Sequence, residues 1–302
     1  MSSASISLSV IVPAYNYATT LRRALVSVIP QLTDSHELIV IDDGSIDDTP
    51  AVVAELAREF PGKFRYVRKD NGGLSSARNR GIQESSGDFL MFLDADDELL
   101  PEALARLESH LSSHPDTRMV VGGHISVWPD GRTREHRPKQ IPADPIRCLR
   151  DYLLDKNLVI SNGACAMHRD VFSRGNYPES FRSAEDIPVF AQTLAYYPCS
   201  ILPAPLAYIH KHDDSLRHQF VHAKAGGTRL VDEVFSEQRL GPEFQFLKQK
   251  YSAQRNLSLF RSAYLSNDVD AAKDYLRNAV KQDWKVLFKS SYMKKAIRLW
   301  LR

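Results

Sequence analysis

Short apolar runs alternate with amphipathic segments along the first third of the chain. An apolar, β-branched run predicts a buried strand over 8–12, and further strands are predicted over 37–41, 64–68 and 89–93. Apolar residues at helical spacing predict helices over 19–28, 49–60, 74–85 and 102–111. Strands that are apolar throughout and alternate with helices are typical of a parallel sheet covered on both faces. We therefore predict an α/β fold.

The alternation weakens beyond residue 112. Further strands are predicted over 119–121, 124–128 and 164–168, and further helices over 151–158 and 187–194. The stretch 131–145 is polar, basic and rich in proline, which predicts a loop.

Polar residues follow three of the predicted strands. They lie within 13–16 after the first strand, 42–45 after the second and 94–96 after the fourth. In open α/β sheets, ligands bind outside the carboxyl ends of the strands, so we expect a binding site at this edge. For 42–45 a simple turn before a helix is the alternative, because its composition suits one.

The acidic residues Asp94, Asp96 and Asp97 come directly after a buried strand. In extended backbone, Asp94 and Asp96 would point to the same side. A hard divalent cation such as Mg²⁺ or Mn²⁺ prefers oxygen ligands and would offset their repulsion. The alternative is that these acids are solvated at the end of a strand.

Composition and charge exclude several classes of protein. The 302 residues carry a net charge of +2, which does not favour a nucleic-acid partner. Three widely spaced cysteines form no zinc pattern and suggest no disulfide framework, which favours a reducing cytosol. No signal peptide and no uninterrupted apolar run of membrane-spanning length is apparent. We expect a cytoplasmic protein, or one at the inner face of the plasma membrane.

Four motifs in this order, SVIVPAYN, VIDDGSIDDT, NGGLSSARNRGI and FLDADD, resemble those of family 2 glycosyltransferases with the GT-A fold. The resemblance covers about 6–220 and is densest over 8–98. It implies a GT-A catalytic domain over 1–220, with a nucleotide-sugar half (1–112) and an acceptor half (113–220). We expect 221–302 to form a mainly helical extension.

The resemblance also implies an activity. It is the inverting transfer of one hexose-type sugar from a UDP- or dTDP-linked donor to a hydroxyl of a glycan or glycolipid, in bacterial envelope polysaccharide or lipopolysaccharide synthesis. The Gln-x-x-Arg-Trp motif of processive synthases is missing from the sequence, which favours single transfer.

The resemblance implies a role for each residue that matches one of the family's motifs. The residues assigned to nucleotide-sugar binding are Pro13, Tyr15, Asp42, Asp43, Arg78, Asp94 and Ala95. Asp96 and His212 are assigned to a divalent cation, Mn²⁺ or Mg²⁺, with His210 as the alternative histidine. Asp186 is assigned as the general base, and the supporting residues are Asn16, Asp97 and Glu185.

Each assignment has a structural alternative. Tyr15 could be a half-buried aromatic at a strand end, and Arg78 a solvated helix arginine. Asp186 could be one of the acids favoured in a first helical turn.

Two other protein classes compete with a glycosyltransferase. A sugar nucleotidyltransferase would need a glycine-rich loop and a lysine after the first strand, where this chain has Pro-Ala-Tyr-Asn-Tyr. A non-catalytic sugar-nucleotide-binding module predicts loss of Asp96 or Asp186, and both are present.

The last stretch, 281–302, holds seven Lys or Arg residues against one Asp, with aromatic residues between them. A basic, aromatic helix can lie on an anionic bilayer. Packing against the rest of the protein is the alternative.

Overall fold

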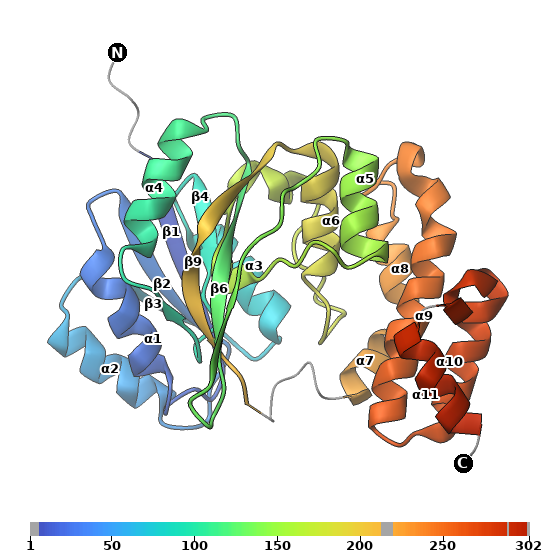
Figure 1. Ribbon diagram of the computed structural model, residues 1–302. Helices are drawn as coiled ribbons and strands as arrows, with labels where there is room; N and C mark the ends of the chain where they lie inside the picture. The colour runs from blue at the N-terminus through green and yellow to red at the C-terminus, as the bar shows by residue number, and fades with distance from the viewer. Residues whose placement is uncertain (1–5, 213–219, 289, 301–302) are drawn as a thin grey trace. The chain divides into compact units, whose positions relative to one another are not determined.

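A computed structural model describes residues 6–212, 220–288 and 290–300, which divide into two compact units (Figure 1). The unit that we call the sheet unit comprises the described residues of Met1–Ile141, Leu158–Glu179 and Tyr196–His212. The helical unit comprises those of Pro142–Asn157, Ser180–Ala195 and Asp213–Arg302. The functional division predicted at residue 220 stays a prediction.

A parallel half-sheet begins the sheet unit, as predicted. Its strands are β1 (Leu8–Ala14), β2 (His36–Asp42), β3 (Arg65–Arg68) and β4 (Phe89–Phe92). They lie in the order β3-β2-β1-β4, and every pair is parallel. The carboxyl ends of these strands therefore meet at one edge of the sheet.

The other half of the sheet is mixed in direction. Beyond β4 the order continues β8-β6-β9-β5, with β7 paired to β6. Strand β8 is antiparallel to β4 and β6, whereas β6 and β9 are parallel. The bounds are β5 (Glu98–Leu99), β6 (Met119–Val127), β7 (Thr133–His136), β8 (Cys165–His168) and β9 (Cys199–His210).

Predictions for this half were partly confirmed and incomplete. The two short strands expected over 119–128 are one strand, β6, whose pairing with β9 shifts register at Gly123. The expected loop 131–145 contains β7, which pairs with β6 as a hairpin. Strand β9 was not predicted. Two prolines interrupt its sequence, and Pro205 is accommodated opposite the irregularity at Gly123.

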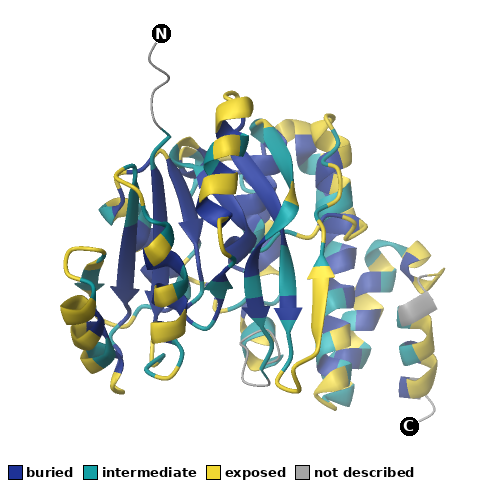
Figure 2. Ribbon diagram, turned by 60° about the vertical axis from the view of Figure 1, so that its left-hand side comes forward, coloured by how far each residue is buried: buried dark blue, intermediate teal, exposed yellow. Residues whose placement is uncertain are grey.

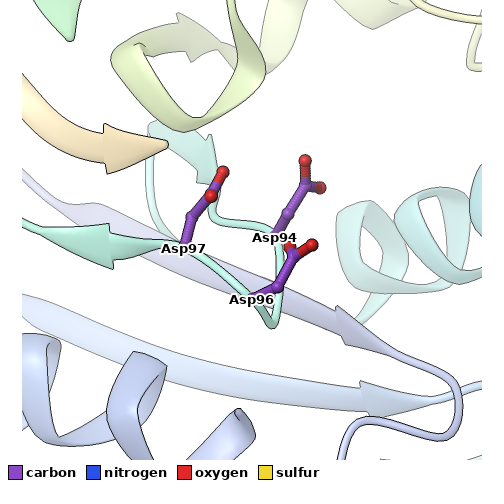
Figure 3. A group of neighbouring side chains, drawn as sticks. All are labelled: Asp94, Asp96 and Asp97. Atoms are coloured by element: carbon purple, nitrogen blue, oxygen red, sulfur yellow. The ribbon is translucent and has the colours of Figure 1, made fainter. Parts of the chain in front are cut away.

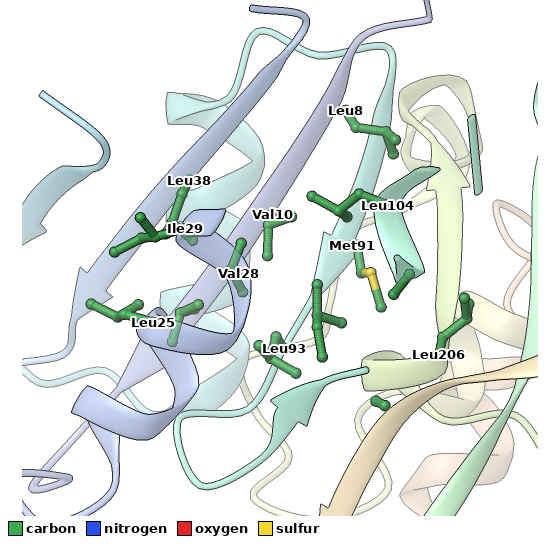
Figure 4. Packing of buried hydrophobic residues seen from close by; sticks show 14 of the residues in the cluster. Leu8, Val10, Leu25, Val28, Ile29, Leu38, Met91, Leu93, Leu104 and Leu206 are labelled. Carbon is green, nitrogen blue, oxygen red and sulfur yellow. The ribbon is translucent and has the colours of Figure 1, made fainter. Parts of the chain in front are cut away.

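Helices α1 (Leu21–Val28), α2 (Thr49–Glu59) and α4 (Ala103–Ser113) cover one face of the parallel strands. Leucines and valines of these helices share one buried cluster with alternate strand residues, such as Val10 and Met91 (Figure 4). This burial of apolar surface supplies the main driving force for the sheet unit.

Helix α3 (Leu74–Glu84) covers the opposite face. Its Gly81 lies so close to Ile11 of β1 that a Cβ there would be 2.4 Å from Ile11 Cγ2. In Figure 2 the inner strands are dark blue for buried, whereas helices on the surface show yellow, exposed residues. Coverage of both faces by helices was predicted. Short 3₁₀ segments complete the sheet unit at Ile29–Gln31, Asn162–Ala164 and Arg169–Arg174.

The helical unit has its own core, formed mainly by α9, α10 and α11, with Leu257, Phe260 and Leu299 at its centre. A mainly helical C-terminal region was predicted and is confirmed. The helix predicted over 151–158 extends too far, because the helical turns there end at Leu154. The elements are α5 (Pro145–Leu149), a π-helical turn (Arg150–Leu154), α6 (Ile187–Tyr196), α7 (Phe220–Gly226), α8 (Arg229–Val234), a 3₁₀ segment (Pro242–Leu247), α9 (Lys248–Leu265), α10 (Val269–Gln282), a 3₁₀ segment (Trp284–Phe288) and α11 (Ser290–Trp300).

Within the described residues, the helices are too short or too polar for any of them to cross a bilayer.

Candidate functional site

Three carboxylates gather in a turn that follows β4. Strand β4 ends at Phe92, and the backbone N–H of Asp97 donates to the carbonyl of Asp94 at 3.0 Å. Carboxylate oxygens of Asp94, Asp96 and Asp97 lie within 4.8 Å of one another (Figure 3). The expectation of extended backbone here was wrong: the turn, anchored by the fully buried Ala95, brings the acids together.

The acidic cluster is electrostatically unfavourable by itself. Asp97 is only 4% exposed, and its burial, together with the negative charges of Asp94 and Asp96, raises its pKa to about 8. Burial and the charge of Asp94 likewise raise the pKa of Asp96. Several carboxylate oxygens at this spacing form the donor set that Mg²⁺ and Mn²⁺ prefer. The residues present therefore fit a divalent cation.

The structure distinguishes the two histidines. The Nε2 of His212 lies 2.5 Å from Asp96 Oδ2, so this imidazole reaches the acidic cluster. The Nε2 of His210 lies 2.7 Å from Glu98 Oε1 instead. The backbone N–H of His210 donates to Asp97 Oδ1 at 2.8 Å. Of the two candidates, His212 is the one placed beside the acids, and its role as a metal ligand stays a prediction.

Arg78 of α3 faces the same cluster. Its Nη2 donates to Asp94 Oδ1 at 3.0 Å, and its guanidinium lies 5.2 Å from the ring centroid of Tyr177. The arginine is only 2% exposed, so it is not the solvated helix arginine of the alternative interpretation. Asn79 fixes the position of Tyr177 because its Nδ2 donates to the carbonyl of Tyr177 and its Oδ1 accepts from the N–H.

The carboxylate of Asp43, at the end of β2, holds the loop that leads into α3. Asp43 Oδ1 accepts from Lys69 Nζ at 2.6 Å and from the N–H of Gly72 at 2.9 Å. Asp43 Oδ2 accepts from the N–H of Gly73 at 2.6 Å. These contacts position the loop before α3, and a further hydrogen bond from a nucleotide base stays a prediction.

Asp42 and Asn16 organise the neighbouring loops. Asp42 is fully buried, and its two oxygens accept from the N–H of Ser45 and the hydroxyl of Tyr66. Asn16 has a φ of 59°, and its Oδ1 accepts from the N–H of Ile46 at 2.9 Å. Asparagine tolerates this left-handed conformation. The hydrogen bond from Ser45 to Asp42 is the kind expected if 42–45 is a simple turn before a helix. A direct role of Asp42 in binding a ligand stays a prediction.

The loop after β1 presents an aromatic side chain to solvent. Pro13 is buried, whereas Tyr15 is 42% exposed and available for stacking. Tyr17 lies in the same loop and was not among the predicted site residues. Burial first, and then the charges of Asp96 and Asp94, raise the pKa of Tyr17, so its hydroxyl lies in the field of the acidic cluster.

Asp186 and Glu185 belong to the helical unit and precede α6. The carbonyl of Asp186 accepts from the N–H of Phe190 at 2.9 Å, and Ala184 has a φ of 63°. Glu185 is 8% exposed. Burial, with a further contribution from the charge of Asp186, raises the pKa of Tyr251 in the same unit. The catalytic role of Asp186 stays a prediction.

The curled α/β sheet, with its acidic turn at the carboxyl edge of the parallel strands, defines a protein of the GT-A class. The model of glycosyl transferase family 2 matches residues 9–175, which is more than half of the chain. The chain therefore belongs to glycosyl transferase family 2.

Solved structures with the same fold are distant in sequence. Residues 1–349 of S. aureus TarS, in complex with UDP-GlcNAc, give a TM-score of 0.62 at 16% identity, over 91% of each chain. The mannosyltransferase PcManGT from Pyrobaculum calidifontis, in complex with GDP-Man and Mn²⁺, gives 0.58 at 16% identity, over 98% of this chain and 85% of that one. These likenesses establish the fold.

Curated relatives match over part of their length. The Bacillus subtilis minor teichoic acid biosynthesis protein GgaB is 34% identical over 130 residues, which are 42% of this chain and 14% of GgaB. The GalNAc(5)-diNAcBac-PP-undecaprenol beta-1,3-glucosyltransferase of Campylobacter jejuni is 34% identical over 152 residues, 49% of this chain and 48% of that enzyme. The matched segment thus spans less than half of either relative.

Proposed function

We propose that this chain transfers one sugar, with inversion at the anomeric carbon, from a UDP- or dTDP-linked donor to a hydroxyl of a glycan or lipid-linked acceptor of the bacterial cell envelope. The observation that carries the proposal is the cluster of Asp94, Asp96 and Asp97, with Arg78 paired to it, at the carboxyl edge of the parallel strands. The proposal of a nucleotide-sugar donor is supported by the complexes of TarS and PcManGT. The proposal of a lipid-linked acceptor is supported by the name of the Campylobacter relative.

On the donor side, Asp96 and His212 would hold a divalent cation. When bound, such a cation supplies charge that stabilises a departing nucleoside diphosphate. Arg78, held in place by Asp94 and the ring of Tyr177, would donate to diphosphate oxygens, for which a guanidinium is well suited. The exposed ring of Tyr15 would stack on the base.

On the acceptor side, Asp186 would accept the proton of the attacking hydroxyl. A single base that activates an acceptor opposite the leaving group produces inversion. The Asp186→Asn variant should therefore bind the donor normally but release nucleoside diphosphate about 10²–10⁴-fold more slowly. Full turnover in this variant would remove Asp186 from the proposal.

A thermal-shift panel of UDP-, dTDP- and GDP-sugars with and without MnCl₂ tests the donor assignment. Ligand at about 100 times its Kd stabilises the folded state by about 2.7 kcal/mol, which raises the unfolding midpoint measurably. We expect a shift that needs Mn²⁺ and that disappears in Asp96→Asn. The matched control is Asp116→Asn, which changes an exposed aspartate and should keep the shift. An equal shift in Asp96→Asn would refute the metal site.

We also propose that the C-terminal tail, 281–302, contacts an anionic membrane surface; residues 289, 301 and 302 lie outside the described part. Trp284, Phe288 and Ile297 are 60%, 72% and 55% exposed, among lysines and arginines. Ala296 and Leu299 are buried in the core of the helical unit. The tail therefore packs on this unit and still exposes aromatic and basic groups, which suit an interface with anionic lipid.

Co-sedimentation with liposomes tests this contact. Vesicles that contain phosphatidylglycerol should bind the chain, and pure phosphatidylcholine vesicles should not. The Trp284→Ala/Phe288→Ala variant should bind at least several-fold less, whereas Phe246→Ala, at an exposed phenylalanine outside the tail, should bind normally. Equal binding by both variants would reject the tail as the contact.

A further inference from the structure

The helical unit contains a cavity of about 660 Å³ that no role described above uses. This volume lies within the range of small-molecule sites. It is bordered by α8, by the 3₁₀ segment before α9, and by α9 and α10. Most of its lining side chains carry an amide or a hydroxyl group, namely Thr228, Gln245, Gln249, Ser252, Asn256, Asn278 and Gln282.

Two acceptor atoms in this lining are buried without a partner. Asn256 is 1% exposed, and its Nδ2 donates to the carbonyl of Ser252 at 2.9 Å. This bond fixes the orientation of the amide, so the atom left over is Oδ1, an acceptor. Neither Asn256 Oδ1 nor Gln282 Oε1 has a hydrogen-bond partner within the part of the chain that the structure describes. A buried unsatisfied acceptor is unfavourable, and a ligand with hydroxyl donors would satisfy it.

The charge of the lining indicates the class of ligand. The charged side chains that border the cavity are Asp232 and Lys248, which form an ion pair at 2.9 Å and so cancel each other. The lining residues include no arginine and no aromatic ring, so the cavity does not suit a phosphate or a nucleotide base. A neutral ligand with many hydroxyl groups fits, because amides offer both donors and acceptors to hydroxyls.

We propose that this cavity binds a neutral carbohydrate and so forms a glycan subsite. Its lining residues are far in sequence from the donor-binding motifs. That the glycan is part of the acceptor rests on the proposed function; the binding itself does not. Asn256 Oδ1 and Gln282 Oε1 accept hydrogen bonds from sugar hydroxyls, and the exposed Asn278 also lines the cavity.

Titration of the full chain with maltotriose and with triacetylchitotriose, followed by saturation-transfer difference NMR, tests the proposal. We expect binding of at least one trisaccharide, weakened about tenfold or more in Asn256→Leu, which is the loss of about 1.4 kcal/mol. Leucine has a similar shape and removes an unsatisfied polar group, so the variant should unfold at the same or a higher temperature. A loss of binding can then be separated from misfolding.

A second variant tests whether the loss of binding is specific to the cavity or only to position 256. Gln282→Ala should also weaken binding, and its matched control is Gln238→Ala, at an exposed glutamine outside the cavity. The Mn²⁺-dependent nucleotide-sugar shift should persist in Asn256→Leu, so failure of the donor assignment and failure of this site give different results. If neither trisaccharide binds, or if Asn256→Leu and Gln282→Ala both bind normally, the proposal is overturned.

Discussion

Replacement of Asp97 by asparagine removes one of the three carboxylates that the turn after β4 holds within 4.8 Å of one another. The asparagine Oδ1 can still accept the N–H of His210, which donates to Asp97 Oδ1 at 2.8 Å. The substitution therefore removes a negative charge and leaves the turn's hydrogen bond in place. In metal-free protein we expect Asp97→Asn to increase stability, by an amount that depends on pH.

The size of the effect follows from the pKa of Asp97, which burial and neighbouring charges raise from 3.8 to about 8. Between these two pH values, the unfolded chain has lost the proton and the folded protein keeps it. Folded protein therefore binds more protons, and its stability falls as pH rises, by about 1.4 kcal/mol per pH unit. From pH 5 to pH 7 the wild-type protein should lose about 3 kcal/mol that Asp97→Asn does not lose.

Urea unfolding in EDTA at pH 5, 6 and 7, followed by circular dichroism, measures this difference. The advantage of Asp97→Asn should grow over this range, while Asp116→Asn should track the wild type. With MnCl₂ the stability advantage of Asp97→Asn should shrink, because under the proposed function the variant lacks one carboxylate beside the bound cation. A stability difference that stays constant from pH 5 to pH 7 would show that burial and repulsion do not raise the pKa of Asp97.

Two further predictions concern single contacts. Gly81→Ala should lower the free energy of unfolding by about 1–3 kcal/mol, since its Cβ would lie 2.4 Å from Ile11 Cγ2, and an unchanged urea midpoint would contradict this packing. His212→Ala should weaken Mn²⁺-dependent nucleotide-sugar binding about tenfold or more, because its Nε2 lies 2.5 Å from Asp96, whereas His210→Ala should affect mainly stability through its contact with Glu98. Equal losses of nucleotide-sugar affinity in a calorimetric titration would contradict this distinction.

The parallel half of the sheet could be predicted because each of its strands and helices is specified by a pattern within its own segment of sequence. Strands β1, β2 and β4 are largely apolar runs that are buried, whereas the edge strand β3 is only partly so, and each helix repeats its apolar residues on one face. Parallel strands must be joined by crossovers, so the alternation itself limits the topology. The carboxyl-edge location of the acidic residues followed from that topology.

The mixed half could not be predicted in the same way, because its strands depend on their partners. The glycines of β6 weaken its strand signal, yet a Cβ at Gly122 would lie 2.5 Å from Leu206 of β9, so the close approach requires glycine. Pro205 likewise signals a break in a strand but occurs where the register of β9 already shifts. Both residues look unfavourable locally and are accommodated only by the neighbouring strand.

Within the site, residue identity could be predicted more readily than backbone geometry. The spacing of Asp94 and Asp96 suggested a shared side, but their proximity comes from a turn, which also brings in Asp97. The contact between Arg78 and Asp94 joins residues 16 positions apart, and that between His212 and Asp96 joins residues 116 apart. Such pairs depend on tertiary structure, which local patterns do not encode.

The cost of the acidic turn is itself an argument for its function. A strand can end at the surface with one solvated acid, yet here three carboxylates are packed together and one of them, Asp97, is almost fully buried. Burial and repulsion then raise the pKa of Asp97 and Asp96, which means that the metal-free fold is less stable at neutral pH than an uncharged turn would be. Arg78 pairs with Asp94 and His212 contacts Asp96, yet the pKa values of Asp96 and Asp97 stay raised; a divalent cation beside these carboxylates would offset the remaining repulsion.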